Sequence, residues 1–339
     1  MAGVVGTEEP RRTGGRTVQI LGVAACYYAA AQLGLLRDLT VGGAVVTPIW
    51  PPTGVAVAAL LILGLGCWPG ITLGAFLAVL SLTTPGPAVL GVLLGNTAAP
   101  VCAALLLRRA RFRTDLSRLR DGLALVFLGA LTAMLISATI GVGLLLLSGS
   151  LPGQGFWFVW LAWWVGDAMG VLIVTPLLLL LRHGVRRPLP LGRWKEATAL
   201  VIAVCVVVPL AAYSSISLLF LVYPLIIWAA LRFQLTGSVL CALLSSVVAT
   251  VAATDAVGAF AGLSRVEVLV KLQAFNGGIT LTALLLSAVI IEQRNTRRSV
   301  ERACQELVEV LEHLTAGEAP PPKAQSGTDD DRGRPDEAP

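Results

Sequence analysis

The chain has 339 residues, of which 56% are hydrophobic and 13% are charged. Soluble globular proteins are about 25% charged and about 45–50% apolar even when glycine is counted, so this chain lies far outside that class. The composition excludes a soluble enzyme, a secreted disulfide scaffold and a disordered regulator, because none of these keeps so much apolar surface out of water. The sequence predicts an integral membrane protein.

The net charge of +5 does not indicate a nucleic-acid-binding protein. The basic residues lie in short loops between apolar runs, which is the topology signal of polytopic membrane proteins. The six cysteines are widely spaced, and none lies in a C-x-x-C motif or close to a histidine. We therefore expect neither a metal site nor a disulfide framework, and no cofactor is predicted.

Ten apolar runs follow one another along the chain. A helix needs about 20 apolar residues to cross about 30 Å of hydrocarbon. The runs cover roughly residues 17–36, 50–66, 68–84, 87–107, 121–147, 156–181, 197–212, 214–231, 235–253 and 267–291. The breaks near 64–68 and 212–214 are weak, so eight or nine spans are an alternative. The predicted fold class is an all-α polytopic membrane helix bundle of about ten spans.

Arginine-rich loops predict the orientation, because cytoplasmic loops collect Lys and Arg. With ten spans and the N-terminus inside, the basic loops 108–120 and 182–195 lie in the cytoplasm. The outer loops then contain only Arg37, Arg265 and Lys271. We therefore expect a multi-pass protein of the plasma membrane with both termini in the cytoplasm.

The predicted domain organisation follows from the same runs. Residues 1–16 form a cytoplasmic N-terminal segment, 17–291 the integral membrane domain, 292–316 a cytoplasmic helix and 317–339 a disordered tail. The tail is rich in Pro, Ser and Asp and cannot bury a core. A signal peptide over residues 11–31, cleaved after Ala29-Ala30-Ala31, is an alternative for the N-terminus. The apolar run continues to Leu36, which disfavours cleavage.

Asp167 is the strongest functional signal, because an ionisable side chain far from both ends of a span is costly and is usually paired, hydrated or functional. It lies about 22 Å from the loop residue Arg182, at about 1.5 Å per helical residue. Asn96 and Ser137 lie at similar depths, about 18 Å and about 24 Å from their own loops. We expect these three polar residues to form one pocket where their spans adjoin.

Each of these signals also has a purely structural explanation. Asp167 can fix helix packing through a hydrogen bond to a neighbouring span, which Gly166 and Gly170 would allow to approach closely. The aromatic stretch 156–164 fits an interfacial girdle better than an aromatic cage. The other candidates for ligand binding or switching are Thr139, Trp50, Thr53 and Trp164, and Trp50 equally fits the start of a helix anchored at the interface.

Several motifs, in this order, resemble the first membrane-associated sensor (MASE) domain family, an integral membrane input module of bacterial signalling proteins. They are Trp50-Pro51-Pro52-Thr53-Gly54, Trp68-Pro69-Gly70, Gly95-Asn96-Thr97, Ile136-Ser137-Ala138-Thr139-Ile140-Gly141, Trp163-Trp164-Val165-Gly166-Asp167, Trp228-Ala229-Ala230-Leu231-Arg232-Phe233 and the closing Leu272-Gln273 to Glu292-Gln293-Arg294. The resemblance covers about residues 17–295. It implies a sensor that is coupled to a histidine kinase, a diguanylate cyclase or a similar output domain.

Only residues 292–339 follow the last span, whereas a kinase or cyclase domain needs well over about 100 residues. We therefore expect an input module without an output domain of its own. Apolar residues repeat at steps of four and three, as in a heptad stripe, at Val300, Cys304, Leu307, Leu311 and Leu314. Two heptads are few, so an amphipathic stub is an alternative to a coiled coil.

The sequence thus predicts a non-catalytic sensory or regulatory membrane protein of bacterial signal transduction, as in two-component systems. Its expected partners are the lipid bilayer and a kinase, cyclase or transporter protein, or a second copy bound through the helix 292–314, but not nucleic acid. The alternative is a small proton- or cation-coupled transporter that uses Asp167. A membrane-embedded enzyme is disfavoured, because the spans contain no His-rich motif, no Asp pair and no serine with a candidate base.

Overall fold

The computed structural model describes residues 9–37, 39–41, 44–82, 86–149, 151–183 and 193–315. Within these residues the fold is all-α apart from one short hairpin, in which β1 (Leu39–Val41) pairs antiparallel with β2 (Ala44–Val46). The prediction of an all-α membrane helix bundle is confirmed. The tail predicted to be disordered, 317–339, and the first eight residues lie outside the described residues.

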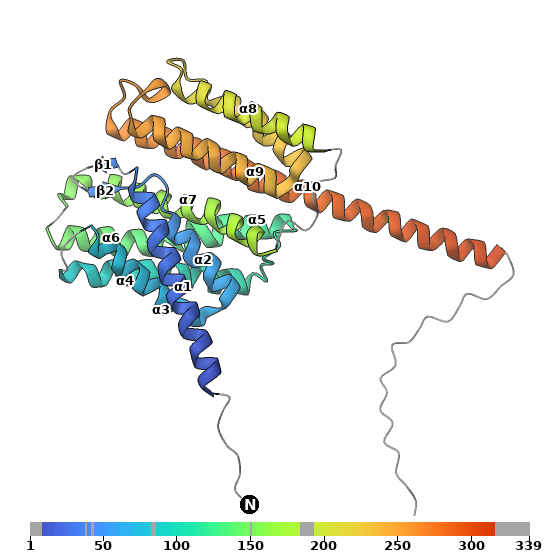
Figure 1. Ribbon diagram of the computed structural model, residues 1–339, viewed down its shortest axis with the longest axis horizontal. Coiled ribbons are helices and arrows are strands. Elements are labelled where there is room, and N and C mark those ends of the chain that lie inside the picture. The colour runs from blue at the N-terminus through green and yellow to red at the C-terminus, as the bar shows by residue number, and fades with distance from the viewer. Residues whose placement is uncertain are drawn as a thin grey trace, which may run out of the picture. The chain divides into compact units, whose positions relative to one another are not determined.

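The helices follow in the order shown in Figure 1. They are α1 (Glu9–Leu35), α2 (Pro51–Leu63), α3 (Trp68–Leu80), α4 (Pro87–Arg109), α5 (Leu119–Ala124), α6 (Met134–Leu147), α7 (Phe156–His183), α8 (Trp194–Tyr213), α9 (Val222–Thr254) and α10 (Arg265–Thr315). A π-helical segment, Leu125–Thr132, joins α5 to α6. Short 3-10 turns precede α3, α7, α9 and α10, at Leu65–Cys67, Gly153–Gly155, Leu219–Leu221 and Gly258–Phe260. Prolines lie in the first turn of α2, α3 and α4, where a missing N–H breaks no helical hydrogen bond.

Seven helical segments in the described part are long and apolar enough to cross a membrane. They are α1, α4, the continuous segment from α5 to α6, α7, α8, α9 and α10. The helices α2 and α3 are shorter, with 13 residues each. The predicted runs 214–231 and 235–253 are joined in α9, which is kinked at Gln234. The ten runs therefore all become helical, while the number of membrane crossings stays a prediction.

The kink in α9 reverses the direction of the chain. Arg232, just before the kink, pairs with Glu196 in the first turn of α8. Gly258, just after the end of α9, lies against Tyr213 at the end of α8. Since α8 has 20 residues and is therefore about 30 Å long, the part of α9 after Gln234 runs back along α8. The part before the kink begins a few residues beyond the end of α8, so the two parts are antiparallel.

Contacts between helix ends define two ends of the bundle formed by residues up to Glu292. At one end the Arg108 guanidinium donates to the Leu60 carbonyl across 3.2 Å, and the Glu292 carboxylate accepts from the Leu119 N–H across 3.0 Å. We call this the arginine end. The opposite end contains the last turns of α1 and α3, which are joined by a 3.0 Å hydrogen bond between Gln32 and Ser81. The arginine-rich loop 110–118 therefore lies at the arginine end.

Three apolar clusters hold this bundle together. One joins α1, α2, α3 and α4, the second joins α2, the segment from α4 to α7, and parts of α9 and α10, and the third joins α8, α9 and α10 to α6 and α7. Large apolar side chains also cover the outside of the bundle, such as Leu90, Phe127 and Trp157. An exposed apolar surface of this extent suits contact with lipid rather than water. Residues Gln293–Thr315 continue α10 and belong to a separate compact unit.

Candidate functional site

Glycines on α7 allow the start of α2 to approach at backbone contact. A Cβ atom on Gly166 would lie 2.6 Å from the Thr47 carbonyl oxygen, and one on Gly170 would collide with the Trp50 carbonyl oxygen. The Trp50 N–H donates to the Gly166 carbonyl across 2.9 Å. Thr47 contacts Gly166, and Trp50, which lies further along the chain, contacts Gly170. The two segments therefore run in the same direction, and α2 is parallel to α7. This close approach brings the first turn of α2 beside Asp167.

Asp167 is buried between these two helices, with 1% of its surface exposed. The Thr53 hydroxyl on α2 donates to Oδ1 of Asp167 across 2.6 Å. The other oxygen, Oδ2, is buried and has no hydrogen-bond partner among the described residues. The Thr53 hydroxyl therefore holds Oδ1, and the Ser137 and Trp163 side chains also lie close enough to the carboxylate to interact with it. Oδ2 has no direct partner among the described residues and can accept a further hydrogen bond.

The other two polar residues at the predicted depth lie side by side on α4 and α6. The Ser137 hydroxyl donates to the Asn96 side-chain oxygen across 3.1 Å, and the indole N–H of Trp163 donates to Ser137 across 3.2 Å. Asn96 and Ser137 are both buried. A short chain of hydrogen bonds therefore runs from α7 through α6 to α4.

A cavity of about 110 Å³ opens beside Asp167. Its polar and aromatic lining consists of Tyr27, Thr47, Trp50, Asn96, Trp163 and Asp167, and its apolar lining consists of Leu35, Ala75, Ala78, Val79, Leu82, Val92 and Gly166. The Trp50 side chain hydrogen-bonds to the Tyr27 hydroxyl, and Tyr27 is fully buried. Leu35 and Leu82 lie at or just beyond the last turns of α1 and α3, so the cavity lies toward the end opposite the arginine loops.

The structure brings most of the predicted site residues together. Trp50, Asn96 and Asp167 line the cavity, and Thr53 and Ser137 are one hydrogen bond away from it. Two candidates lie elsewhere, which are Thr139 and Trp164. Thr139 accepts a hydrogen bond from the Trp160 indole across 3.1 Å, and the Trp164 indole donates to the Leu131 carbonyl in the π-helical segment across 2.8 Å.

The aromatic stretch at the start of α7 is divided between two environments. Trp157 and Phe158 are 71% and 55% exposed, as the girdle interpretation predicts. Trp163 instead lines the cavity. Sequence reasoning also missed Tyr27 and Thr47 in the lining, although a tyrosine inside the first apolar run was a detectable signal.

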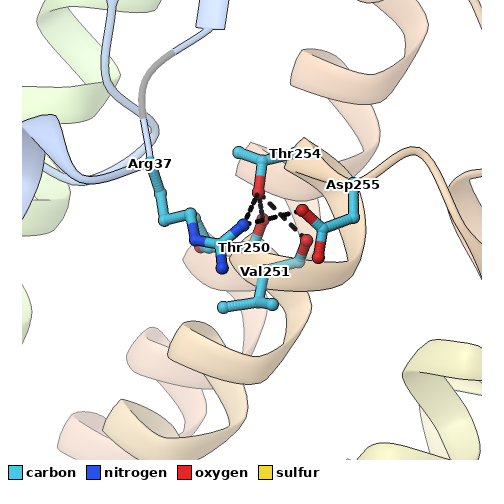
Figure 2. Close-up of polar contacts among 5 residues, drawn as sticks. All are labelled: Arg37, Thr250, Val251, Thr254 and Asp255. Carbon is cyan, nitrogen blue, oxygen red and sulfur yellow. Dashed lines mark hydrogen bonds and ion pairs between the residues drawn. The ribbon is translucent and has the colours of Figure 1, made fainter.

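Two polar contacts join this site to the later helices. The Gln273 side chain on α10 donates to the Ala162 carbonyl on α7, five residues before Asp167, across 3.2 Å. In the second contact, drawn in Figure 2, Arg37 forms an ion pair of 2.7 Å with Asp255 and contacts the Thr254 hydroxyl at 3.5 Å. Arg37 follows the last turn of α1, and Asp255 caps α9. Both contacts link helices that line the cavity to α9 and α10.

Residues of the predicted partner helix are exposed in the second unit. Val300, Cys304, Leu307, Leu311 and Leu314 all lie on the surface of the helical segment Gln293–Thr315.

The described residues contain no group of three or more His, Cys, Asp or Glu side chains that could hold a metal ion.

Comparison with known proteins gives one match. The model of the MASE1 family, membrane-associated sensor domain 1, matches residues 20–294. The match includes every residue that lines the cavity and extends through the membrane part of α10. No curated protein and no solved structure matches the chain.

Proposed function

The chain belongs to the MASE1 family of membrane-associated sensor domains, and from this premise we propose that the cavity beside Asp167 is its sensory site. A MASE1 domain is a membrane sensory input domain of signalling proteins and is not a catalytic domain. The observation that carries the proposal is the half-satisfied carboxylate in a cavity. A charge buried in a membrane bundle is costly and is usually paired, hydrated or functional.

The signal passes from the cavity to α10 through α7. Asp167 and the Ala162 carbonyl lie on the same helix, and Gln273 of α10 is hydrogen-bonded to that carbonyl. A ligand that binds Asp167 more tightly in one position of α7 therefore favours that position and, through Gln273, one position of α10. Such a population shift requires only that the ligand binds the two positions with different affinity.

The helix that continues from α10 delivers the signal to a partner. Its exposed apolar residues, from Val300 to Leu314, form the contact with a kinase, a cyclase or a transporter protein, or with a second copy of the chain. Both termini lie in the cytoplasm, since the arginine end of the bundle faces inward by the positive-inside rule.

The test compares disulfide crosslinking through Cys304 in Asp167→Asn and in the parent chain, with the other cysteines replaced by alanine. Allosteric coupling of about 1–3 kcal/mol shifts an equilibrium by about 5- to 150-fold, so we expect a several-fold change in crosslinking yield. Asp121→Asn is the matched control, because Asp121 is also a buried aspartate whose Oδ2 lacks a partner among the described residues, yet it does not line the cavity. Unchanged crosslinking and expression in Asp167→Asn would overturn the proposal.

A further inference from the structure

We propose that the cavity beside Asp167 binds a small aliphatic ammonium ion, a protonated primary amine, as its ligand. This ligand would be the signal of the sensory site proposed above, and its role as a signal rests on that proposal. Three independent features of the cavity support this proposal: its charge, its aromatic lining and its size.

The negative charge of the cavity favours a cation that can donate hydrogen bonds. Among the lining residues Asp167 alone carries a charge, and its Oδ2 is buried without a hydrogen-bond partner among the described residues. A buried carboxylate needs a paired charge and hydrogen bonds to offset its lost hydration. An ammonium group supplies both in one charge-assisted hydrogen bond.

The rest of the lining distinguishes an organic cation from a metal ion. Three aromatic side chains, Tyr27, Trp50 and Trp163, line the cavity together with Asp167. Aromatic rings attract cations through their quadrupole, and organic ammonium groups are bound in this way. A hard metal ion such as Ca²⁺ takes about six to eight oxygen ligands, whereas much of this lining is aliphatic, including Val79 and Val92. The apolar side suits the alkyl part of an amine.

The volume of the cavity limits the size of the amine. It measures about 110 Å³, which is smaller than the apolar cavity of about 150 Å³ known to hold benzene. An ammonium group with about three carbons therefore fits inside the cavity, and any longer part of the ligand must lie outside it. The ammonium group can belong to a free amine or to the ethanolamine headgroup of a phospholipid, because the cavity lies toward the end of the bundle where Leu35 and Leu82 are placed.

Binding is measured on the full chain in nanodiscs of phosphatidylglycerol, with n-propylammonium chloride as the probe. We expect a saturable rise in the thermal unfolding midpoint, and no comparable rise with n-propanol, which has nearly the same size but no charge, or with sodium chloride. A parallel series replaces part of the lipid by phosphatidylethanolamine. If the headgroup is the ligand, this lipid alone raises the midpoint and n-propylammonium adds little.

Two variants test the site itself. Asp167→Asn is expected to weaken n-propylammonium binding by at least about tenfold, because a hydrogen bond to a charged group is about twice as strong as a neutral one. Val79→Phe keeps the carboxylate but fills the cavity, and it is expected to abolish binding, so the proposal stays testable if Asp167→Asn does not fold. Asp121→Asn is the control and is expected to bind as the parent chain does.

The outcomes separate the ligand from the sensory role. Equal stabilisation by n-propanol or sodium chloride, or undiminished binding to Val79→Phe, overturns the assignment of an ammonium ligand. If n-propylammonium binds through Asp167 but leaves crosslinking through Cys304 unchanged, the ligand assignment holds and the sensory proposal is overturned. If Asp167→Asn changes crosslinking while n-propylammonium does not bind, the sensory role stands and the ligand assignment is overturned.

Discussion

The hydrogen bond between Thr53 and Asp167 is the single contact that joins the first turn of α2 to the buried carboxylate. It spans 2.6 Å between the hydroxyl and Oδ1. Close packing at Gly170 sets this distance, because the Trp50 carbonyl leaves no room there for a Cβ atom. The hydrogen bond therefore depends on Gly170 as well as on Thr53 and Asp167.

Removing the hydroxyl of Thr53 takes away the 2.6 Å hydrogen bond to Oδ1 of Asp167. Thr53→Val keeps the shape of the side chain, so its main effect is to leave a buried acceptor unsatisfied, which costs about 1–3 kcal/mol. We expect the free energy of unfolding in detergent to fall by that amount. Thr139→Val is the matched control, since Thr139 is exposed. Equal losses in both variants would contradict the role assigned to Thr53.

The polar part of the site could be predicted from the sequence, but most of the aromatic part could not. Asn96, Ser137 and Asp167 have a common depth that follows from counting residues to the nearest basic loop. Tyr27 reaches the site because α1 packs on α3, where the α1 residues Ile20 and Ala24 lie against two α3 glycines. Counting along the chain does not reveal which helices are neighbours.

At the scale of elements, Gln234 is the residue where two predicted spans meet without a loop. Its φ of 57° and ψ of −145° lie in a region that glycine adopts easily and other residues rarely. Apolar periodicity predicted the break between 231 and 235, but it gave no indication that a single strained residue makes it. The sequence likewise gave no sign of the π-helical segment 125–132, since backbone hydrogen-bond register leaves no hydropathy pattern.

Replacing Gln234 with glycine is expected to stabilise the protein. A residue held in such a conformation stores about 1–3 kcal/mol of strain, and Gln234→Gly releases part of it. Gln19→Gly is the matched control, because Gln19 lies inside α1, where glycine costs about 0.5–1 kcal/mol. The measurement is the thermal unfolding midpoint of both variants in the same detergent. Destabilisation by Gln234→Gly of the same size as in the control would show that the kink is not strained.

For the whole molecule, the direction of each helix follows from the contacts at its ends. Parallel packing of α1 on α3 and of α2 on α7, together with the reversal at Gln234, fits the alternating helix directions that the ten-span prediction requires. The charge distribution agrees, since the loop 110–118 lies at the arginine end and Arg37 lies beyond the last turn of α1. The ten-span topology and its orientation stay a prediction, which local contacts and loop charge both favour.

Labelling of single cysteines with a membrane-impermeant maleimide tests that topology. In a chain without other cysteines, Ser148→Cys, Ser215→Cys and Ala256→Cys are expected to react in intact cells, because these exposed residues lie at the end opposite the arginine loops. Ser117→Cys and the native Cys304 are expected to react only after the cells are permeabilised, since basic loops stay in the cytoplasm. Ser215 and Ala256 flank α9 on either side. Their labelling from opposite sides of the membrane would mean that α9 crosses once, and the reversal at Gln234 would be wrong.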